Sequence, residues 1–262
     1  MTEKTIIRST PPNLLGQPDN KLFRKPDFEA LIFQKGYRII HEQAIACPCR
    51  GKSGEARPTC QNCLGYGYAY INPVETKGIL TSLNHTTKYQ QWSPELVGTI
   101  NVTVRDSERL SILDKITLKD RTSVMTEVRS MIQTETERFI FCSYPVQKVN
   151  FLFVFSNDTS KLVKLISGDF EVVQGNNFII KLSNSFVLPV GFNGAISIDY
   201  EYHPSYVIVD IPHDIRATFI YNQKGQLTET VMPVQGVARK THIVLGEPTN
   251  RAGTNLLNNS DY

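Results

Sequence analysis

Residues 47–68 read CPCRGKSGEARPTCQNCLGYGY, and this cysteine-rich stretch organises the sequence around it. It carries four of the five cysteines of the chain as two close pairs, separated by ten residues. These cysteines are Cys47, Cys49, Cys60 and Cys63. Four thiolates within one short loop form a ligand set for tetrahedral Zn²⁺. The sequence therefore predicts a zinc-binding loop over about residues 44–70.

Two glycines follow the last cysteine in the pattern CxxCxGxG. Gly65 and Gly67 tolerate a positive φ, which lets the backbone fold back tightly beneath metal-bound sulfurs. A closed four-sulfur site has no open coordination position for a substrate, so we expect the zinc to be structural. Such a metal holds together a loop that is too small to have a core of its own.

A pair of disulfides is the alternative use of the four cysteines. The N-terminal residues MTEKTIIRSTPPNLLGQ contain no apolar segment typical of a secretory signal peptide. A reducing compartment favours a metal site over disulfides. The fifth cysteine, Cys142, lies in the apolar run FIFCSYP, which is typical of a buried structural thiol.

The segments on either side of the cysteine loop predict a helix and a hairpin. The run DFEALIFQKG (27–36) favours a short helix with Asp27 as its cap and Gly36 as its end. The run YRIIHEQAIA (37–46) then leads into the loop as a strand, and YAYINPVETKG (68–78) returns as its partner. Zinc would thus hold the tip of a β-hairpin.

Further along, the pattern is mostly that of strands. In TINVTV, Ile100, Val102 and Val104 fall on one face, and LDKITL (113–118) is typical of a barrel strand entered after a tight turn. The segment 121–133 is ambiguous. Its apolar residues Val124, Val128 and Ile132 recur every four positions, which favours a helix.

The second half of the chain is richer in β-branched and aromatic runs of about ten-residue spacing, separated by turn residues. In AISIDYEY, for example, the residues on one face are Ile196, Ile198, Tyr200 and Tyr202. We therefore predict a mainly β protein of barrel or sandwich domains with few short helices. The expected divisions are an extended arm (1–26), a barrel-like domain with the zinc loop (27–145), a sandwich-like domain (146–245) and a polar tail (246–262).

One strand has an unusual pattern that favours an interface. Around YVIVDI both faces are nearly apolar, which predicts a strand buried on both sides, in a sheet stack or between subunits. Asp210 is the polar exception on one face, and an interfacial ion pair with Arg216 could set the register of two subunits. The candidate interface residues are Trp92, Tyr206, Asp210 and Arg216.

Charge argues against tight nucleic-acid binding by the body of the protein. The net charge is +3, and residues 1–25 alone contribute this excess, so the remainder is neutral. The cysteine loop itself carries Arg50, Lys52 and Arg57. These cations are explained either by the negative charge of a four-thiolate zinc site or by a nucleic-acid-binding zinc ribbon.

Motifs of known enzymes are missing from the sequence. It contains no HExxH, GxSxG or P-loop, so we expect no catalytic activity. No apolar run approaches the ~20 residues of a membrane helix, and we expect no membrane partner. CxxCxGxG also recurs four times in DnaJ-type co-chaperones, but this chain has one full copy and no HPD motif.

Taken together, residues 45–219 resemble neck and head-closure proteins, the head-to-tail connectors of tailed bacteriophages. The resemblance is carried by the cysteine loop, by VGTINVTVRDSERLSILDKITL and by two later strand phrases. These two are GDFEVVQGNNFIIKL (168–182) and ISIDYEYHPSYVIVDIPHDIRATF (196–219). This chain is longer than the small single-barrel members, so the second β domain would be an added module.

The resemblance implies a function in virion structure. It implies a homo-oligomeric ring between the portal or an adaptor and the tail, assembled in the host cytoplasm. Such a ring closes the filled capsid and lets DNA pass through its lumen without specific binding, for which a neutral body is suitable. The alternative expectation is a zinc-ribbon protein that binds nucleic acid.

Overall fold

The computed structural model describes residues 25–57, 60, 62–63, 65–82, 98–157, 161–175, 177–212, 217–221 and 227–245. Within these ranges the fold is mainly β, with antiparallel sheets and two short α-helices, as predicted. Helix α1 (Lys25–Lys35) begins two residues before Asp27, which lies in its first turn rather than capping it. The expected tail (246–262) lies outside the described residues, as does the arm up to residue 24.

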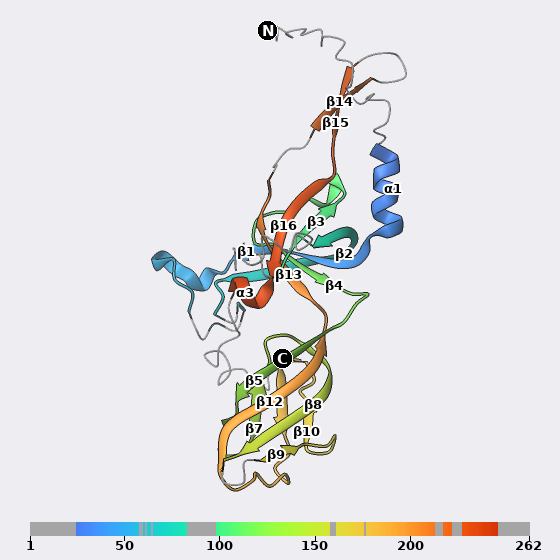
Figure 1. Ribbon diagram of the computed structural model, residues 1–262. Coiled ribbons are helices and arrows are strands. Elements are labelled where there is room, and N and C mark those ends of the chain that lie inside the picture. Colours follow the sequence, from blue (N-terminus) through green and yellow to red (C-terminus); the bar gives the residue numbers. More distant parts are fainter. Residues whose placement is uncertain are drawn as a thin grey trace, which may run out of the picture.

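A six-stranded antiparallel barrel forms the centre of the molecule (Figure 1). Each strand pairs with the next and the last pairs with the first, so the barrel is closed. In barrel order the strands are β1 (Tyr37–Ala46), β2 (Tyr68–Ser82), β3 (Thr99–Val104), β16 (Val234–Lys240), β13 (Ser205–Asp210) and β4 (Lys115–Leu118).

Alternating apolar residues fill the interior of the barrel. Ile39, Val102, Val104, Ile116 and Ile208 are fully buried there. Burying each of these side chains contributes about 1.5–3 kcal/mol. The predicted inward face of TINVTV is therefore confirmed, with its Val residues in the core and its Ile100 packed against it.

A β-sandwich is inserted into the barrel between β4 and β13 (Figure 1). Its two sheets face each other across a core that includes Cys142, whose side chain is completely buried, as predicted. One sheet has the order β5 (Ser123–Ser130), β12 (Phe192–Tyr202), β8 (Val146–Ser156) and β9 (Lys161–Lys164). The other has the order β10 (Phe170–Val172), β11 (Ile179–Leu182), β7 (Arg138–Phe141) and β6 (Ile132–Gln133).

This insertion corrects the expected domain boundary near residue 145. The barrel combines residues 37–118 with residues 205–240, and the sandwich occupies 123–202. The predicted face of β12 is confirmed, because its four apolar and aromatic residues are all at most 1% exposed. Alternation of apolar and polar residues thus predicted the strands. Which strands pair depends on contacts between residues far apart in the sequence, and the local pattern does not show these.

The expected helix over 121–133 is wrong, because this segment forms β5 and β6. Val124 pairs opposite Glu201 and Val128 opposite Ser197 on β12. A spacing of four is even, so it places residues on one face of a strand as well as on one face of a helix. Here that face is the outer one, and the two valines are 57% and 66% exposed.

Two further elements flank the barrel. Strands β14 (Ala217–Tyr221) and β15 (Leu227–Val231) form an antiparallel ribbon between β13 and β16. Figure 1 shows this ribbon at one end of the molecule and the sandwich at the other, with the barrel between them. The short helix α3 (Thr241–Leu245) follows β16 and lies beside β13 and the cysteine loop.

Candidate metal centre

The cysteine loop closes the hairpin of β1 and β2, as predicted. Ala46 at the end of β1 pairs with Tyr68 at the start of β2. One residue further into the loop, the amide of Cys47 donates a hydrogen bond of 2.9 Å to the carbonyl of Gly67. A short 3₁₀ helix (Pro48–Ser53) then carries Cys49. The hairpin register thereby brings the first and last parts of the loop together.

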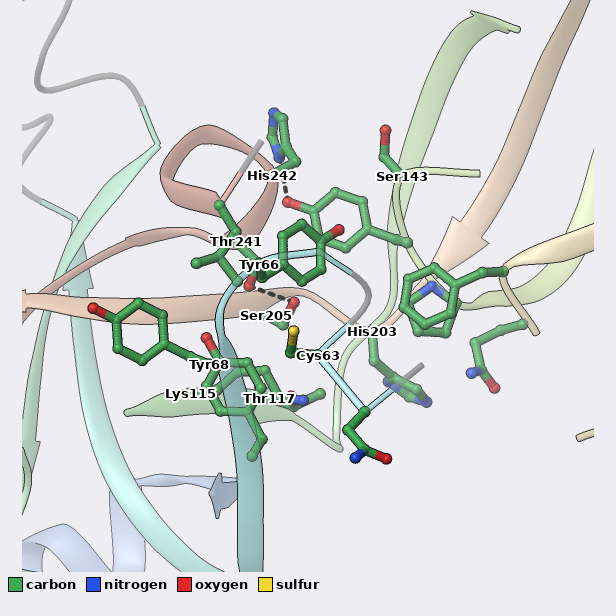
Figure 2. A pocket seen from close by; sticks show the side chains of 17 residues that line it. Cys63, Tyr66, Tyr68, Lys115, Thr117, Ser143, His203, Ser205, Thr241 and His242 are labelled. Atoms are coloured by element: carbon green, nitrogen blue, oxygen red, sulfur yellow. Dashed lines mark hydrogen bonds between the residues drawn. The ribbon is translucent and has the colours of Figure 1, made fainter. Parts of the chain in front are cut away.

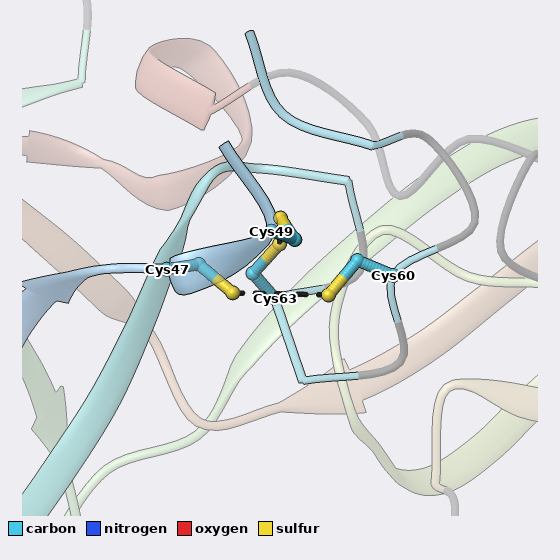
Figure 3. Close-up of side chains that lie close together, drawn as sticks. All are labelled: Cys47, Cys49, Cys60 and Cys63. Carbon is cyan, nitrogen blue, oxygen red and sulfur yellow. Dashed lines mark hydrogen bonds between the residues drawn. The ribbon is translucent and has the colours of Figure 1, made fainter. Parts of the chain in front are cut away.

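The four sulfur atoms of Cys47, Cys49, Cys60 and Cys63 face one another (Figure 3) and all lie within 4.8 Å of each other. The Cys47 and Cys60 sulfurs are 3.7 Å apart, and those of Cys49 and Cys63 are 3.5 Å apart. A tetrahedron with metal–sulfur bonds of about 2.3 Å has edges of about 3.8 Å. The separations therefore fit one metal ion held by four thiolates.

The same separations are inconsistent with the disulfide alternative. A disulfide bond is about 2.05 Å long, and all four cysteines are free thiols here. The donor set is also complete, since four sulfurs leave no coordination position for a substrate. The cluster is thus suited to a structural metal rather than to a catalytic one.

Glycines shape the loop around the cluster. Gly65 and Gly67 have φ values of 85° and 81°, as the sequence predicted. A Cβ atom on Gly67 would approach the Nε atom of Arg50 to 2.9 Å, so a larger residue there requires the Arg50 side chain to shift, in addition to the strain of its positive φ. Gly51 and Gly54 also have positive φ values. Unlike Gly65 and Gly67, they belong to no sequence motif that would have predicted this.

The thiols differ in acidity before any metal binds. A hydrogen bond from the backbone of Cys63 lowers the pKa of Cys60 to about 7. Burial raises the pKa of Cys63 itself to about 12. The amide of Cys49 lowers the pKa of Cys47, but burial and the neighbouring thiols outweigh it and leave a net rise. Binding a cation here requires the most buried thiols to lose their protons.

The three cations of the loop have different surroundings. The guanidinium of Arg50 lies 4.5 Å from the ring centroid of Tyr68 and donates a hydrogen bond of 3.1 Å to its hydroxyl. Lys52 and Arg57, by contrast, are exposed. Arg50 therefore supports the loop internally, and only the other two face solvent.

Two of the four candidate interface residues, Tyr206 and Asp210, lie within the described part of the chain. Tyr206 is partly buried and packs against the barrel core, and this burial raises the pKa of its hydroxyl. Asp210 is exposed at the end of β13, opposite Val237. Trp92 and Arg216 lie outside the described residues. The predicted burial of β13 on both faces holds for residues 205–208 and ends at Val209.

Sequence reasoning missed a buried polar pair next to the loop. The Nε2 atom of His41 on β1 lies 2.7 Å from an Oδ2 oxygen of Asp114, and both side chains are at most 5% exposed. Asp114 also accepts hydrogen bonds from the amides of Ser111 and Ala44. The carboxylate thus connects β1 to the turn before β4. Its 73-residue separation from His41 left no local signal in the sequence.

Comparison with models of known protein families found no match, and a search among curated proteins found no relative. No helix in the described ranges has the length and apolar character needed to cross a membrane. The fold and the chemistry of the cysteine cluster are therefore the basis for assigning a function.

Proposed function

We propose that this protein is a structural subunit of a homo-oligomeric ring, the neck of a tailed bacteriophage. The ring lies between the portal or an adaptor and the tail, closes the capsid and lets DNA pass through its lumen. Assembly takes place in the host cytoplasm, and the mature location is the virion. The observation that carries the proposal is the β14–β15 ribbon.

The ribbon extends away from the barrel (Figure 1). Within the described residues its two strands pair only with each other. A two-stranded ribbon is at best marginally stable in water, because it has no sheet or core to pack against. A neighbouring copy of the chain would provide that surface. The ribbon is therefore well suited to connect subunits round a ring.

The sandwich offers further apolar surface at the opposite end of the molecule. Ile166, Val187 and Val190 lie in its loops and are between 68% and 85% exposed. Exposed apolar side chains of this size are candidates for a contact surface if they form one contiguous patch in the assembly. An elongated subunit with contact surface at both ends can bridge two layers of a larger assembly.

The metal of the cysteine cluster is proposed to be structural Zn²⁺. Four thiolates in tetrahedral arrangement favour zinc or an iron–sulfur centre, and zinc is the metal that commonly closes short loops of this kind. The cluster secures the tip of the β1–β2 hairpin, two strands of the closed barrel. Its role is to fix one end of the barrel, and no substrate is turned over.

One of the stretches that resemble connector proteins lies in the barrel. The stretch 97–118 includes β3 and β4, and both contribute buried residues to its core. Outside residues 1–25 the sequence is neutral, so a lumen built from such subunits need not hold DNA phosphates tightly. The resemblance and the charge are thus compatible with passage of DNA without specific binding.

The proposal is tested by assembly with and without the ribbon. Because Asp210 and Val237 pair across β13 and β16, a short Gly-Ser linker can replace residues 213–231 without opening the barrel. We expect the full chain to form closed rings by light scattering and electron microscopy, and the shortened chain to stay monomeric with unchanged metal content. Lys161→Ala, an exposed change on β9, is the control and should assemble normally. A monomeric full chain, alone and with a portal, contradicts the proposal.

Exposure of Lys52 and Arg57 favours a second candidate, a nucleic-acid-binding zinc ribbon. This function predicts retention on a DNA resin that falls steeply with salt and weakens when both residues are changed to alanine. For a neck subunit we expect weak retention on the DNA resin, unchanged when Lys52 and Arg57 are replaced by alanine. Chromatography on the same resin therefore distinguishes the two functions.

A further inference from the structure

The four sulfurs of the cysteine cluster form two close contacts that cross the loop. The Sγ atoms of Cys47 and Cys60 are 3.7 Å apart, and those of Cys49 and Cys63 are 3.5 Å apart. Each contact joins a cysteine of the first close pair to one of the second pair, 13 or 14 residues further along the chain. A covalent bond across either contact would therefore hold the two ends of the loop together, as a metal ion does.

Each contact also combines an accessible sulfur with a protected one. Cys49 and Cys60 are partly exposed, whereas Cys47 and Cys63 are buried. An oxidant from solvent reaches the partly exposed sulfur first, and the buried thiol across the contact is placed to react with the product. An accessible cysteine beside a second, resolving cysteine is the usual arrangement of a redox-sensitive pair. The loop contains this arrangement twice.

The part of the loop that follows Cys49 has room to move. A disulfide bond is about 2.05 Å long, so the sulfurs of each contact must approach one another by about 1.5 Å. A Cβ atom built on Gly51 or Gly54 meets no other atom within 4 Å, so the surroundings of this segment are open. The segment can therefore shift without displacing a packed neighbour.

Space is also present beside Cys63. A cavity of about 270 Å³ lies where the cysteine loop, the barrel and the sandwich meet, and Cys63 is among the side chains around it (Figure 2). The barrel adds Thr117 to its wall and the sandwich adds Ser143. A close-packed interior resists movement of its side chains, whereas this adjoining space lets the loop around Cys63 adjust when the metal leaves.

The fifth cysteine is separate from this chemistry. Cys142 is fully buried in the core of the sandwich and does not belong to the cluster of four. A thiol buried in apolar surroundings is inert toward oxidants in solution. Cys142 is thus an internal reference, which should stay reduced as long as the sandwich is folded.

We propose that the cysteine cluster is a site of oxidation by hydrogen peroxide, at which the disulfides Cys47–Cys60 and Cys49–Cys63 replace the metal. At each contact the partly exposed sulfur takes one oxygen of peroxide, the O–O bond breaks, and a sulfenic acid and one water form. The buried thiol then attacks this sulfur, the S–O bond breaks, and the oxygen leaves as a second water.

Two peroxide molecules per chain account for all four thiols. Each is reduced by two electrons to two waters, and each pair of thiols is oxidised by the same two electrons to one disulfide. When the cluster starts as four metal-bound thiolates, solvent supplies the four protons that the waters need. Disulfide sulfurs are no longer thiolate ligands, so the divalent metal ion is released.

The consequence is a loop that stays closed in two environments. In a reducing cytoplasm the metal joins its ends, and in an oxidising medium outside the cell the two disulfides do so. The hairpin of β1 and β2, and with it the closed barrel, would keep its tip in both. Metal release rests on the proposed structural zinc, whereas the disulfide pairing depends neither on zinc nor on ring assembly.

The test treats the purified full chain with hydrogen peroxide and measures thiols and metal together. We expect the number of reactive thiols in the denatured chain to fall from five to one, with release of one metal ion per chain to a chromogenic chelator. Dithiothreitol should restore all five thiols. Cys142→Ala, which removes only the thiol outside the cluster, is the matched control and should fall from four thiols to none.

Peptide mapping without reduction identifies the bonds. Trypsin cleaves after Arg50 and Lys52, which places the two close pairs of cysteines on different peptides. We expect these two peptides to be linked, with fragmentation assigning Cys47 to Cys60 and Cys49 to Cys63. After removal of the released metal, the oxidised chain should melt at a higher temperature than the reduced chain stripped by a chelator, because disulfides constrain the unfolded state.

Unlinked peptides, with disulfides inside each close pair, overturn the proposal. So do four thiols that stay reduced, or that end as sulfinic or sulfonic acids without disulfides. The same mapping on reduced protein stripped of metal separates this inference from the proposed zinc site. A chain that is purified without metal but forms both cross-loop disulfides supports the pairing and contradicts the zinc.

Discussion

The amide of Cys47 donates to the carbonyl of Gly67 across the base of the cysteine loop, at 2.9 Å. This bond continues the β1–β2 ladder by one step and brings the two cysteine pairs within reach of one metal ion. The positive φ of Gly67 lets the chain turn at this point. Barrel and metal site are thus coupled through backbone geometry, and a change in one is expected to affect the other.

Loss of one thiolate should therefore destabilise the hairpin. We expect Cys63→Ser to reduce the bound metal well below one ion per chain and to lower the melting temperature. Addition of a chelator to the original protein should have the same effect, because binding free energy at such sites stabilises the fold. Metal analysis and calorimetry measure both. Cys142→Ala, which removes a buried thiol outside the cluster, should keep its metal.

Metal binding should release protons and weaken in acid. The pKa of Cys63 is raised to about 12 by burial and that of Cys47 is raised as well, so both thiols are protonated at neutral pH without metal. Binding then releases at least about two protons per chain. Calorimetry in buffers of different ionisation enthalpy counts them. An affinity that is constant from pH 8 to pH 6 would contradict a thiolate site.

A buried carboxylate should make the sandwich sensitive to acid. Glu127 accepts hydrogen bonds from the amide and hydroxyl of Ser143, from Arg129 and from the hydroxyl of Tyr200. Burial opposes its ionisation, but the bonds from Arg129 and Ser143 outweigh this and lower its pKa. A carboxyl whose pKa is lowered by folding stabilises the fold above its unfolded pKa, and this stabilisation is lost as the pH falls through the folded value.

We therefore expect stability to fall as the pH drops below the ordinary glutamate value of 4.5. Glu127→Gln should cost about 2 kcal/mol at pH 7 and flatten this dependence, because the amide cannot ionise. Denaturant unfolding at pH 7, 4 and 3 measures both effects. An equally steep loss of stability in the variant would assign the acid sensitivity to other groups.

The pair of His41 and Asp114 should be important for the barrel. Asp114→Ala leaves the imidazole and the amides of Ser111 and Ala44 without their acceptor, which should cost about 3 kcal/mol. The exposed pair of Asp120 with Arg38 is the control, and Asp120→Ala should destabilise the fold far less than Asp114→Ala. Equilibrium unfolding gives both values, and equal costs would contradict a special role for the buried pair.

Local patterns allowed much of the fold to be predicted. The strands 37–46 and 68–78 and the face of β12 follow from alternation, and the metal cluster follows from cysteine spacing. The helix predicted for the segment containing Val124 and Val128 was wrong, because a spacing of four residues places side chains on one face of a strand as well as on one face of a helix. The segment is a strand because it pairs with Glu201 and Ser197 of β12, more than sixty residues away.

Non-local arrangements could not be predicted in this way. The insertion of the sandwich depends on β4 pairing with β13, for example Ile116 with Tyr206, and no local pattern records that contact. The same holds for the cavity lined by Tyr70 on β2 and His203 in the turn between β12 and β13, which lie far apart in the sequence. Their side chains resemble ordinary core and turn residues until the barrel closes.

Native mass spectrometry of the purified full chain is decisive for the proposed ring, because it reports subunit number and bound metal together. We expect one dominant ring of identical chains with one zinc ion per chain. A metal-free monomer at high protein concentration would contradict it.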